Sequence, residues 1–284
     1  MMSNTILPMP DWDMIHRCKT PKSIIRHTDL QSFLTLHVDK EILAFYELAI
    51  MQKSSSCLDA ACKTGINTVY LTQQNLPILG SDISYEAVAK ASQLAAYESK
   101  QTAFFTASWQ ELPAYIPHRF DAILCLPIMK EPEWNAIRKV AVGLFHSLNP
   151  CGFIAFTGPA EGTGKEAAMT KLHQQKEGQF INWHWREGNE SCVCIVNRKR
   201  SSDYMDESYM YIRTCGESAW IESTTRRIPF YWTWKHVQEI MYNAGFCHVE
   251  TRSFELPEGT CSLNVAWKGK SIQHKHSRDE QYLL

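Results

Sequence analysis

The chain has 284 residues, of which 44% are hydrophobic, enough for the core of one domain of about 200 to 250 residues with a subdomain. Its 29 basic and 30 acidic side chains leave a net charge of −1, which gives no electrostatic reason to expect a nucleic acid or an anionic membrane as partner. No apolar run of about 18 residues and no apolar signal core occur, so we expect a cytoplasmic protein with a small-molecule substrate.

Ten cysteines are scattered among predicted strands rather than spaced as a disulfide framework, so we expect reduced core residues. Cys192 and Cys194 alternate along one predicted strand, which points both thiols to the same face. Because they lack a second cluster of metal ligands, a structural role is favoured and no metal is expected.

The first half of the chain predicts alternating helices and strands. Residues 1–50 are expected to form an N-terminal helical cap, in which Ile42, Phe45, Leu48 and Ala49 lie on one apolar stripe. From Ser56 to about Gly158 the alternating runs are CLDAA, GINTVYLTQQ, PILGSD, SYEAVAKASQLAAYES, TAFFTAS, FDAILCL, EWNAIRKVAVGLFHSL and GFIAFTG. These βαβ units predict a parallel sheet with helices on both faces.

After Thr157 the pattern changes to aromatic, alternating runs without a helical period. FINWHWR, SCVCIVNRK, SYMYIRTC and AWIESTTRRIPFYW predict antiparallel strands. The helix TWKHVQEIMYNAGF follows, ends at Gly245, and precedes the strands HVETRSFE and CSLNVAWKG. The predicted α/β protein therefore has a cofactor-binding domain over 51–160 and 233–270, an antiparallel substrate lid over 161–232, and a disordered tail over 271–284.

Two acidic residues mark the ends of predicted strands. Asp59 ends the first strand and Asp82 ends the second. Ligands of an open α/β sheet bind at the carboxyl ends of its strands, where an acid after the second strand can accept hydrogen bonds from two ribose hydroxyls. Each aspartate alone is more readily a helix cap, but together at this spacing they favour a nucleoside-containing cofactor.

The loop AACKTGI, after the first strand, carries Lys63 where a dinucleotide-binding loop carries a glycine. A lysine there obstructs the approach of a pyrophosphate to the backbone, which disfavours NAD and FAD. S-adenosylmethionine has no phosphate, and an ammonium could neutralise the carboxylate of its methionine tail.

Four segments, in order, resemble the motifs of class I S-adenosylmethionine-dependent methyltransferases: LDAACKTG, GSDISYEAVAKA, ASWQEL before FDAILCL, and LNPCG before FIAFTG. The likeness is closest to the glycine N-methyltransferase type, whose first loop reads D-x-A-C-G-T-G and whose chain has a sheet-rich insertion late in the sequence. The resemblance covers roughly residues 40–268. It implies a Rossmann-like class I methyltransferase sheet, a small antiparallel lid insertion, and S-adenosylmethionine as the cofactor.

Carried over to the matching positions, the resemblance implies a set of cofactor-binding residues. The loop around the methionine tail comprises Asp59, Ala60, Ala61, Lys63 and Gly65. The ribose and adenine would be contacted by Asp82, Ile83, Ser108 and Trp109, with Leu126 near the sulfonium. The alternative for Trp109 is a core aromatic ring.

The sequence also departs from the family pattern. Lys63 and Cys151 replace glycines, and the segment TGPAEGTGK has no arginine to hold a substrate carboxylate, which argues against glycine as the substrate. The arginine that grips the cofactor tail is missing too, since LHVDKEILAF offers only His37 and Lys40. We expect Lys63 to replace that cation, while a lysine that points to solvent or abolishes cofactor binding remains the alternative.

The predicted lid is rich in aromatic residues, which can hold an amine or its ammonium through the ring faces. The candidate substrate-binding residues are Trp185, Arg213 and Trp232. The candidate bases are Tyr211, His184 and Tyr231. Ordinary sheet packing is the alternative for each ring, and a local hydrogen bond is the alternative for the histidine.

Methyl transfer is an in-line displacement at a carbon already activated by the sulfonium, so it requires positioning and exclusion of water rather than a triad or a metal. A base serves only to leave the amine neutral. We therefore predict an S-adenosylmethionine-dependent methyltransferase acting on a small-molecule amine. O- or C-methylation of a small metabolite, a degenerate non-catalytic methyltransferase fold and a dinucleotide oxidoreductase stay open, as does a homo-oligomeric state.

Overall fold

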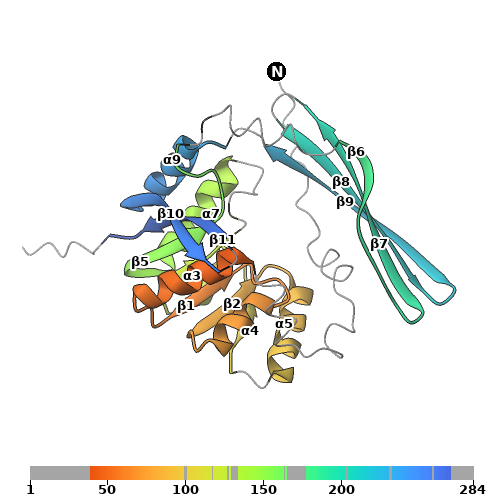
Figure 1. Cartoon of the computed structure of the whole chain (residues 1–284), viewed down its shortest axis with the longest axis horizontal. Coiled ribbons are helices and arrows are strands. Elements are labelled where there is room, and N and C mark those ends of the chain that lie inside the picture. The colour runs from red at the N-terminus through yellow and green to blue at the C-terminus, as the bar shows by residue number, and fades with distance from the viewer. Residues whose placement is uncertain are drawn as a thin grey trace, which may run out of the picture.

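The computed structural model describes residues 39–98, 101–116, 118–126, 128, 134–162, 164, 177–201, 204–229, 232–257 and 259–269. These residues form two sheets that stand side by side in Figure 1. One is seven-stranded, in the order β10-β11-β5-β4-β1-β2-β3, and the other is four-stranded, in the order β6-β7-β8-β9.

Five parallel strands form most of the larger sheet: β1 (Cys57–Ala60), β2 (Ile78–Asp82), β3 (Phe104–Thr106), β4 (Phe120–Leu124) and β5 (Leu148–Phe156). A hairpin of β10 (His248–Leu256) and β11 (Gly259–Trp267) completes it, with β11 antiparallel to both β5 and β10. Dinucleotide-binding sheets place a sixth parallel strand beside the fifth. The antiparallel β11 therefore separates this sheet from that class.

Helices cover both faces of this sheet, as the βαβ pattern predicts. They are α3 (Lys40–Met51), α4 (Ile66–Gln73), α5 (Tyr85–Tyr97), α6 (Leu112–Tyr115), α7 (Trp134–His146) and α9 (Trp234–Ala244). Because neighbouring side chains of a strand point to opposite faces, Leu58 packs with α7 and α9, whereas Cys57 packs with α3. The predicted α/β fold with helices on both faces is confirmed.

The apolar stripe of α3 is also confirmed, since Ile42, Phe45, Leu48 and Ala49 are all fully buried. The rest of the predicted N-terminal cap, residues 1–38, and the predicted tail, residues 271–284, lie outside the described residues. Within the described ranges, no helix is long and apolar enough to cross a membrane.

The predicted end of α9 at Gly245 is confirmed by backbone geometry. Gly245 has a φ of 107°, and a Cβ there would lie 2.9 Å from the ring of Phe145 on α7. At the other end Thr233 and His236 form a capping box. Both ends of α9 are thus fixed by local residues, which holds the helix against α7.

The smaller sheet confirms the antiparallel strands predicted after residue 161. Its strands are β6 (Gly178–Glu187), β7 (Glu190–Arg200), β8 (Tyr204–Cys215) and β9 (Ser218–Pro229), each antiparallel to the next. Cys192 and Cys194 lie buried on one face beside Val196 and Tyr211, as the alternation predicts. Every cysteine among the described residues is a free thiol.

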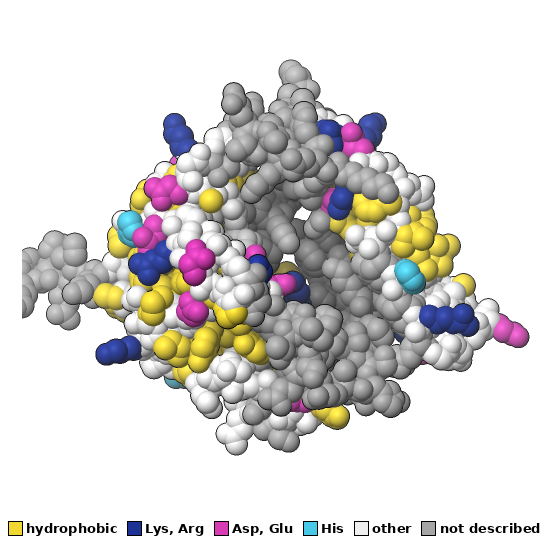
Figure 2. Space-filling view, viewed as in Figure 1, with side chains coloured by type: hydrophobic (Ala, Val, Ile, Leu, Met, Phe, Trp, Pro, Cys, Tyr) yellow, Lys and Arg dark blue, Asp and Glu magenta, His cyan; other side chains and the backbone are white. Residues whose placement is uncertain are grey.

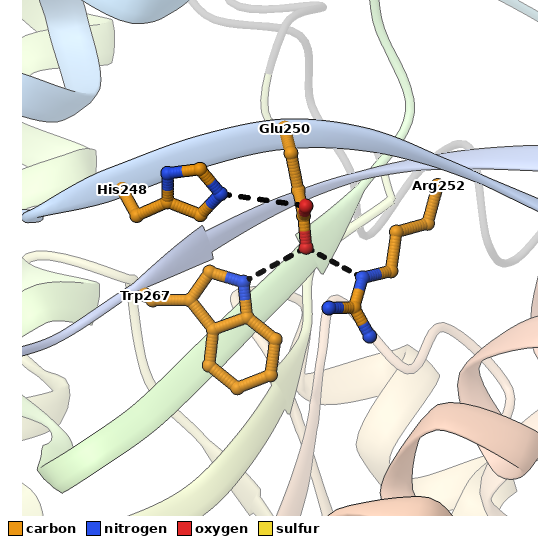
Figure 3. A network of polar contacts seen from close by, with 4 residues as sticks. All are labelled: His248, Glu250, Arg252 and Trp267. Carbon is orange, nitrogen blue, oxygen red and sulfur yellow. Dashed lines mark hydrogen bonds and ion pairs between the residues drawn. The ribbon is translucent and has the colours of Figure 1, made fainter.

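A polar network holds the β10–β11 hairpin together at the start of β10 (Figure 3). Glu250 accepts hydrogen bonds from Arg252 Nε at 2.5 Å and from Trp267 Nε1 at 3.3 Å, and its other oxygen lies 3.3 Å from His248 Nε2. Burial opposes ionisation, but the hydrogen bonds from Arg252 and His248 outweigh it and lower the pKa of Glu250. The network stabilises the outermost strand of the sheet.

Candidate cofactor-binding site

The carboxyl end of β1 is the switch point of the larger sheet, because β1 pairs with β2 on one side and β4 on the other. Crossovers leave in opposite directions from such a point, and the crevice between them is where open α/β sheets bind ligands. Asp59 lies in β1 and Asp82 is the last residue of β2. The fold thus brings the two predicted acids to one edge.

The loop from β1 to α4 has an unusual backbone. Ala61, Lys63 and Gly65 have φ values of 84°, 54° and 81°, all in the left-handed region. A residue with a Cβ costs about 1 to 2 kcal/mol there. The glycine that the resembling family carries at position 63 is therefore the unstrained choice, and Lys63 keeps the same backbone path at a cost in stability.

Two glycines bring the surrounding elements close to this loop. A Cβ at Gly65 would lie 2.6 Å from Ala91 Cβ on α5, and one at Gly80 on β2 would overlap the ring of Phe104. Backbone N–H groups of Ala61 and Cys62 both donate to the carbonyl of Ser81 at 2.8 Å. The loop is thus tied to the end of β2, beside Asp82.

Asp82 is buried and held by backbone donors. Its Oδ2 accepts from the N–H of Lys63 and its Oδ1 from the N–H of Ser84, both at 2.9 Å. Burial raises the pKa of Asp82, while the hydrogen bonds from Ser84 and Lys63 oppose the rise. Because a carboxylate has four lone-pair sites and the N–H of Ile83 is a third backbone donor, the Asp82 side chain can still accept a bond from a ligand hydroxyl.

Asp59 is buried next to Asp82 and accepts a hydrogen bond from Thr68 Oγ1 at 2.7 Å. Burial raises the pKa of Asp59 to about 6, with the charge of Asp82 adding to the rise and Thr68 and Lys63 opposing it. The exposed Lys63 therefore lies within electrostatic reach of both carboxylates. This edge combines buried acceptors with one solvent-facing cation.

The other predicted cofactor residues fall on the ends of the neighbouring strands. Ile83 directly follows Asp82 and is 49% exposed, and Trp109 is half-buried against the core. Ser108 Oγ donates to Glu111 Oε2 at 2.5 Å, and the Ser108 carbonyl accepts from the Glu111 N–H at 3.0 Å. The Ser108 hydroxyl is thus paired with Glu111, the residue directly before α6.

Leu126, predicted near the sulfonium, follows β4. Its carbonyl accepts a hydrogen bond from Thr157 Oγ1 at 2.6 Å, and its side chain packs with the core on the α3 side. Leu126 and Thr157 thereby join the carboxyl ends of β4 and β5. This contact borders the crevice on the side away from β2.

The predicted lid residues are placed apart from one another. Arg213 faces Glu190 at 3.6 Å near the turns at the tip of the smaller sheet, whereas Trp232 is buried in the core with α7 and α9. Tyr211 is 2% exposed and stacks on Tyr209, with ring centroids 6.4 Å apart. These contacts favour structural roles for Arg213, Trp232 and Tyr211.

The structure describes fewer contacts for the remaining predicted lid residues. His184 is exposed on β6. The side chain of Trp185 and the residue Tyr231 lie outside what the structure describes. Among the described residues, the geometry therefore brings the predicted cofactor residues to one edge but places Arg213, Trp232 and Tyr211 elsewhere.

Sequence analysis missed three residues that build the site. Thr68 bonds Asp59, Ser84 caps α5 by accepting from the Ala87 N–H at 3.1 Å, and Gly80 admits the Phe104 ring. Ser84 carried a signal, because a serine directly before a helical run is a preferred cap. The positions of Thr68 and Gly80 depend on tertiary contacts that no local pattern encodes.

The strand order, the antiparallel β11 and the separate four-stranded sheet together define the Rossmann-like methyltransferase fold. Residues 57–152, which contain Asp59 and Asp82, match the family model of a methyltransferase domain. This match covers about a third of the chain. No curated protein matches the sequence.

Solved structures with this fold extend over most of the chain. The sugar N-methyltransferase KedS8 from Streptoalloteichus sp ATCC 53650 has a TM-score of 0.61 and 16% identity, covering 95% of this chain and 96% of its own. CalS10, an amino pentose methyltransferase from Micromonospora echinaspora solved with bound SAM, has a TM-score of 0.56 and 12% identity, covering 85% and 98%. An S-adenosylmethionine-dependent methyltransferase from Clostridium acetobutylicum ATCC 824 has a TM-score of 0.58 and 13% identity, covering 83% and 94%.

These comparisons agree with the predictions at two levels. The predicted fold is confirmed, and the predicted cofactor, S-adenosylmethionine, is supported by the matched family and by the SAM-bound neighbour. The finer resemblance to the glycine N-methyltransferase type finds no counterpart among the matches named here.

Proposed function

We propose that this protein is an S-adenosylmethionine-dependent methyltransferase that methylates the amine of a small molecule. The observation that carries the proposal is the Asp82 carboxylate, fixed at the end of β2 by the N–H groups of Lys63 and Ser84. It lies beside the left-handed loop after β1, within the segment that matches a methyltransferase domain.

The residues of this edge fit the cofactor. Asp82 would accept the ribose hydroxyls, the exposed Ile83 would flank the adenine, and the loop of Ala61, Lys63 and Gly65 would hold the methionine tail. The cofactor, when bound, supplies a methyl group on an activated carbon. A dinucleotide fits less well, because Lys63 occupies the turn that a pyrophosphate must approach.

The protein contributes to catalysis by positioning the methyl donor and the acceptor. Asp82 and the loop fix the donor, and the acceptor must present its lone pair in line at about 3 Å with water excluded. Solvent can accept the amine proton, so no buried base is required. This agrees with the placement of Tyr211 within the smaller sheet rather than at the crevice.

An amine acceptor is supported by two of the structural neighbours, a sugar N-methyltransferase and an amino pentose methyltransferase. We propose that residues 161–232 form a lid that supplies the acceptor pocket, with Trp185 and His184 as its candidate contacts. O- and C-methylation of a small metabolite are the alternative reactions.

Incubating the protein with S-adenosylmethionine and paired sugars tests the proposal, each pair carrying an amine or a hydroxyl at the same carbon. Mass spectrometry should show one added methyl on amino sugars only, and Asp82→Ala should abolish it. Methylation of the hydroxyl partners would transfer the assignment to O-methylation. Tight cofactor binding without turnover on any acceptor would support the non-catalytic alternative.

A further inference from the structure

The two buried carboxylates at the carboxyl edge of the larger sheet are held in different ways. Asp82 accepts hydrogen bonds from the N–H groups of Lys63 and Ser84, which belong to the main chain. Among the described residues, the one hydrogen-bond donor to Asp59 is a side chain, the hydroxyl of Thr68, 2.7 Å from Oδ2. The orientation of the Asp59 carboxylate therefore depends on a single side chain of α4.

Thr68 directs its hydroxyl away from the ordinary partner of a helical threonine. Such a hydroxyl commonly donates to the backbone carbonyl three or four residues earlier. Thr72, one turn further along α4, does so, with its Oγ1 2.9 Å from the carbonyl of Thr68. Thr68 is fully buried, and its single hydroxyl proton is donated to Asp59 instead.

This hydrogen bond favours the ionised form of Asp59. A carboxylate that accepts a bond is stabilised as the anion, whereas burial favours the neutral acid. Burial is the larger effect and raises the pKa of Asp59 to about 6, and the bond from Thr68 is the strongest influence that lowers it. Without the hydroxyl the pKa would rise further, so more of the protein would hold a neutral Asp59 near pH 7.

The charged and titratable groups that the described residues place around Asp59 are few. They are Asp82 on β2, with Lys63 and Cys62 in the loop after β1. Burial raises the pKa of Cys62, so its thiol stays neutral, and β4 faces Asp59 with the apolar Leu124. On the face seen in Figure 2, acidic and basic side chains are interspersed over the side of the larger sheet rather than gathered by sign. The near neighbours therefore govern the ionisation of Asp59.

The ionisation of Asp59 matters because the methionine tail of the cofactor carries two charges. Lys63 is expected to face the carboxylate of the tail, so the ammonium requires an anion near the same loop. Asp59 lies next to the last residue of β1, where this loop begins, and its carboxylate is buried. An ionised carboxylate there complements an ammonium, whereas a neutral one leaves it unpaired.

We propose that Thr68 is a positioning residue of the cofactor site, which orients Asp59 and keeps it ionised so that it binds the ammonium of the methionine tail. This role rests on the proposed function and makes cofactor affinity depend on pH. Affinity is full above the pKa of Asp59 and falls as the pH drops through it, because a proton and the ammonium compete for one carboxylate.

Calorimetric titration of two ligands between pH 5 and pH 8 tests this role. S-adenosylhomocysteine carries the whole tail, whereas 5′-methylthioadenosine has the same nucleoside without the ammonium. Because both ligands present their ribose to Asp82, the ratio of their affinities isolates the contribution of the tail. In the wild type this ratio should fall about tenfold from pH 7 to pH 5.

Thr68→Val removes the hydroxyl and keeps the shape of the side chain. Losing a hydrogen bond to a charged group should raise the midpoint by about one pH unit. The affinity ratio should then be about fivefold below the wild type at pH 6 and within about twofold of it at pH 8. Thr68→Ala should behave in the same way, and Thr68→Ser should restore the wild-type ratio.

Thr72→Val is the matched control in the same helix, since its hydroxyl bonds a backbone carbonyl, and it should match the wild type. A loss in Thr68→Val that is equal for both ligands, or equal at pH 6 and pH 8, would reduce Thr68 to a structural role and overturn the inference. A wild-type ratio that is constant from pH 5 to pH 8 would overturn it too. A protein that binds neither ligand at any pH would overturn the cofactor assignment itself, and this role with it.

Discussion

The two sheets of the molecule differ in how their faces are covered. The seven-stranded sheet buries Leu58 under α7 and α9 and Phe153 on the side of α3, so helices of the same chain cover both faces. The four-stranded sheet buries Cys192 and Tyr211 on one face and exposes Ile181 and Ile221 on the other. The first sheet is covered on both faces and fixes a site at its edge, whereas the second sheet leaves apolar side chains exposed on one face.

Equal truncations in the two sheets should give the largest contrast. Leu58→Ala removes a fully buried side chain and should lower the free energy of unfolding by about 2 to 5 kcal/mol. Ile181→Ala removes an exposed one and should change it by about 0.5 kcal/mol or less in dilute protein. Urea unfolding measures both, and similar losses would show that the second sheet is covered after all.

Asp59→Asn should stabilise the protein at high pH. The folded-state pKa of Asp59 is raised from 3.8 to about 6, so its protonated form is favoured by folding below about pH 4 and that contribution is lost as the pH rises through 6. Removing the buried charge should therefore raise the free energy of unfolding by up to about 3 kcal/mol at pH 8. The gain should disappear near pH 4, and a gain independent of pH would contradict the assignment.

Lys63→Gly and Cys151→Gly form a matched pair, because both residues have left-handed backbones, with φ values of 54° and 65°. Each glycine should raise the free energy of unfolding by about 1 kcal/mol. Only Lys63→Gly should weaken S-adenosylmethionine binding, by about 1 kcal/mol, and less for an analogue without the carboxylate. Tighter binding of the natural cofactor by Lys63→Gly would identify the lysine as an obstruction.

The smallest effect is expected at the outer strand of the larger sheet. Glu250→Gln should lower the free energy of unfolding by about 0.2 to 1 kcal/mol at pH 7. Because the pKa of Glu250 is lowered from 4.5, its contribution is present above that pH and is lost as the pH falls through the folded value. Glu239→Gln, exposed on α9, is the control. A loss that persists at pH 2 would show that packing, not charge, is responsible.

The sequence predicts the parts of the molecule that local patterns determine. The βαβ runs predict the larger sheet. Asp59 and Asp82 mark its carboxyl edge, because an acidic residue at the end of a predicted strand can be recognised from the sequence alone. The glycine replaced by Lys63 indicates a left-handed turn, which the structure has.

The roles of the aromatic and charged lid residues could not be predicted in this way. Trp232 is buried in a core that it shares with α7, which is distant in sequence. The partner of Arg213 depends on the cross-strand register that brings Glu190 near. Which face of β7 becomes buried depends on what packs against it. Composition alone therefore indicates an aromatic sheet but not which rings contact a substrate.

Calorimetric titration of S-adenosylhomocysteine into the wild type, Asp82→Ala and Asp121→Ala tests the central claim most directly. Asp121 is a comparable carboxylate, bonded by Ser55 and Asn149 at 2.8 Å, but it lies at the start of β4. We expect one site per chain, a loss of about 2 to 3 kcal/mol in Asp82→Ala only, and no binding of NAD. Equal affinity in the wild type and Asp82→Ala, or binding of NAD in place of S-adenosylhomocysteine, would contradict the assignment of this edge.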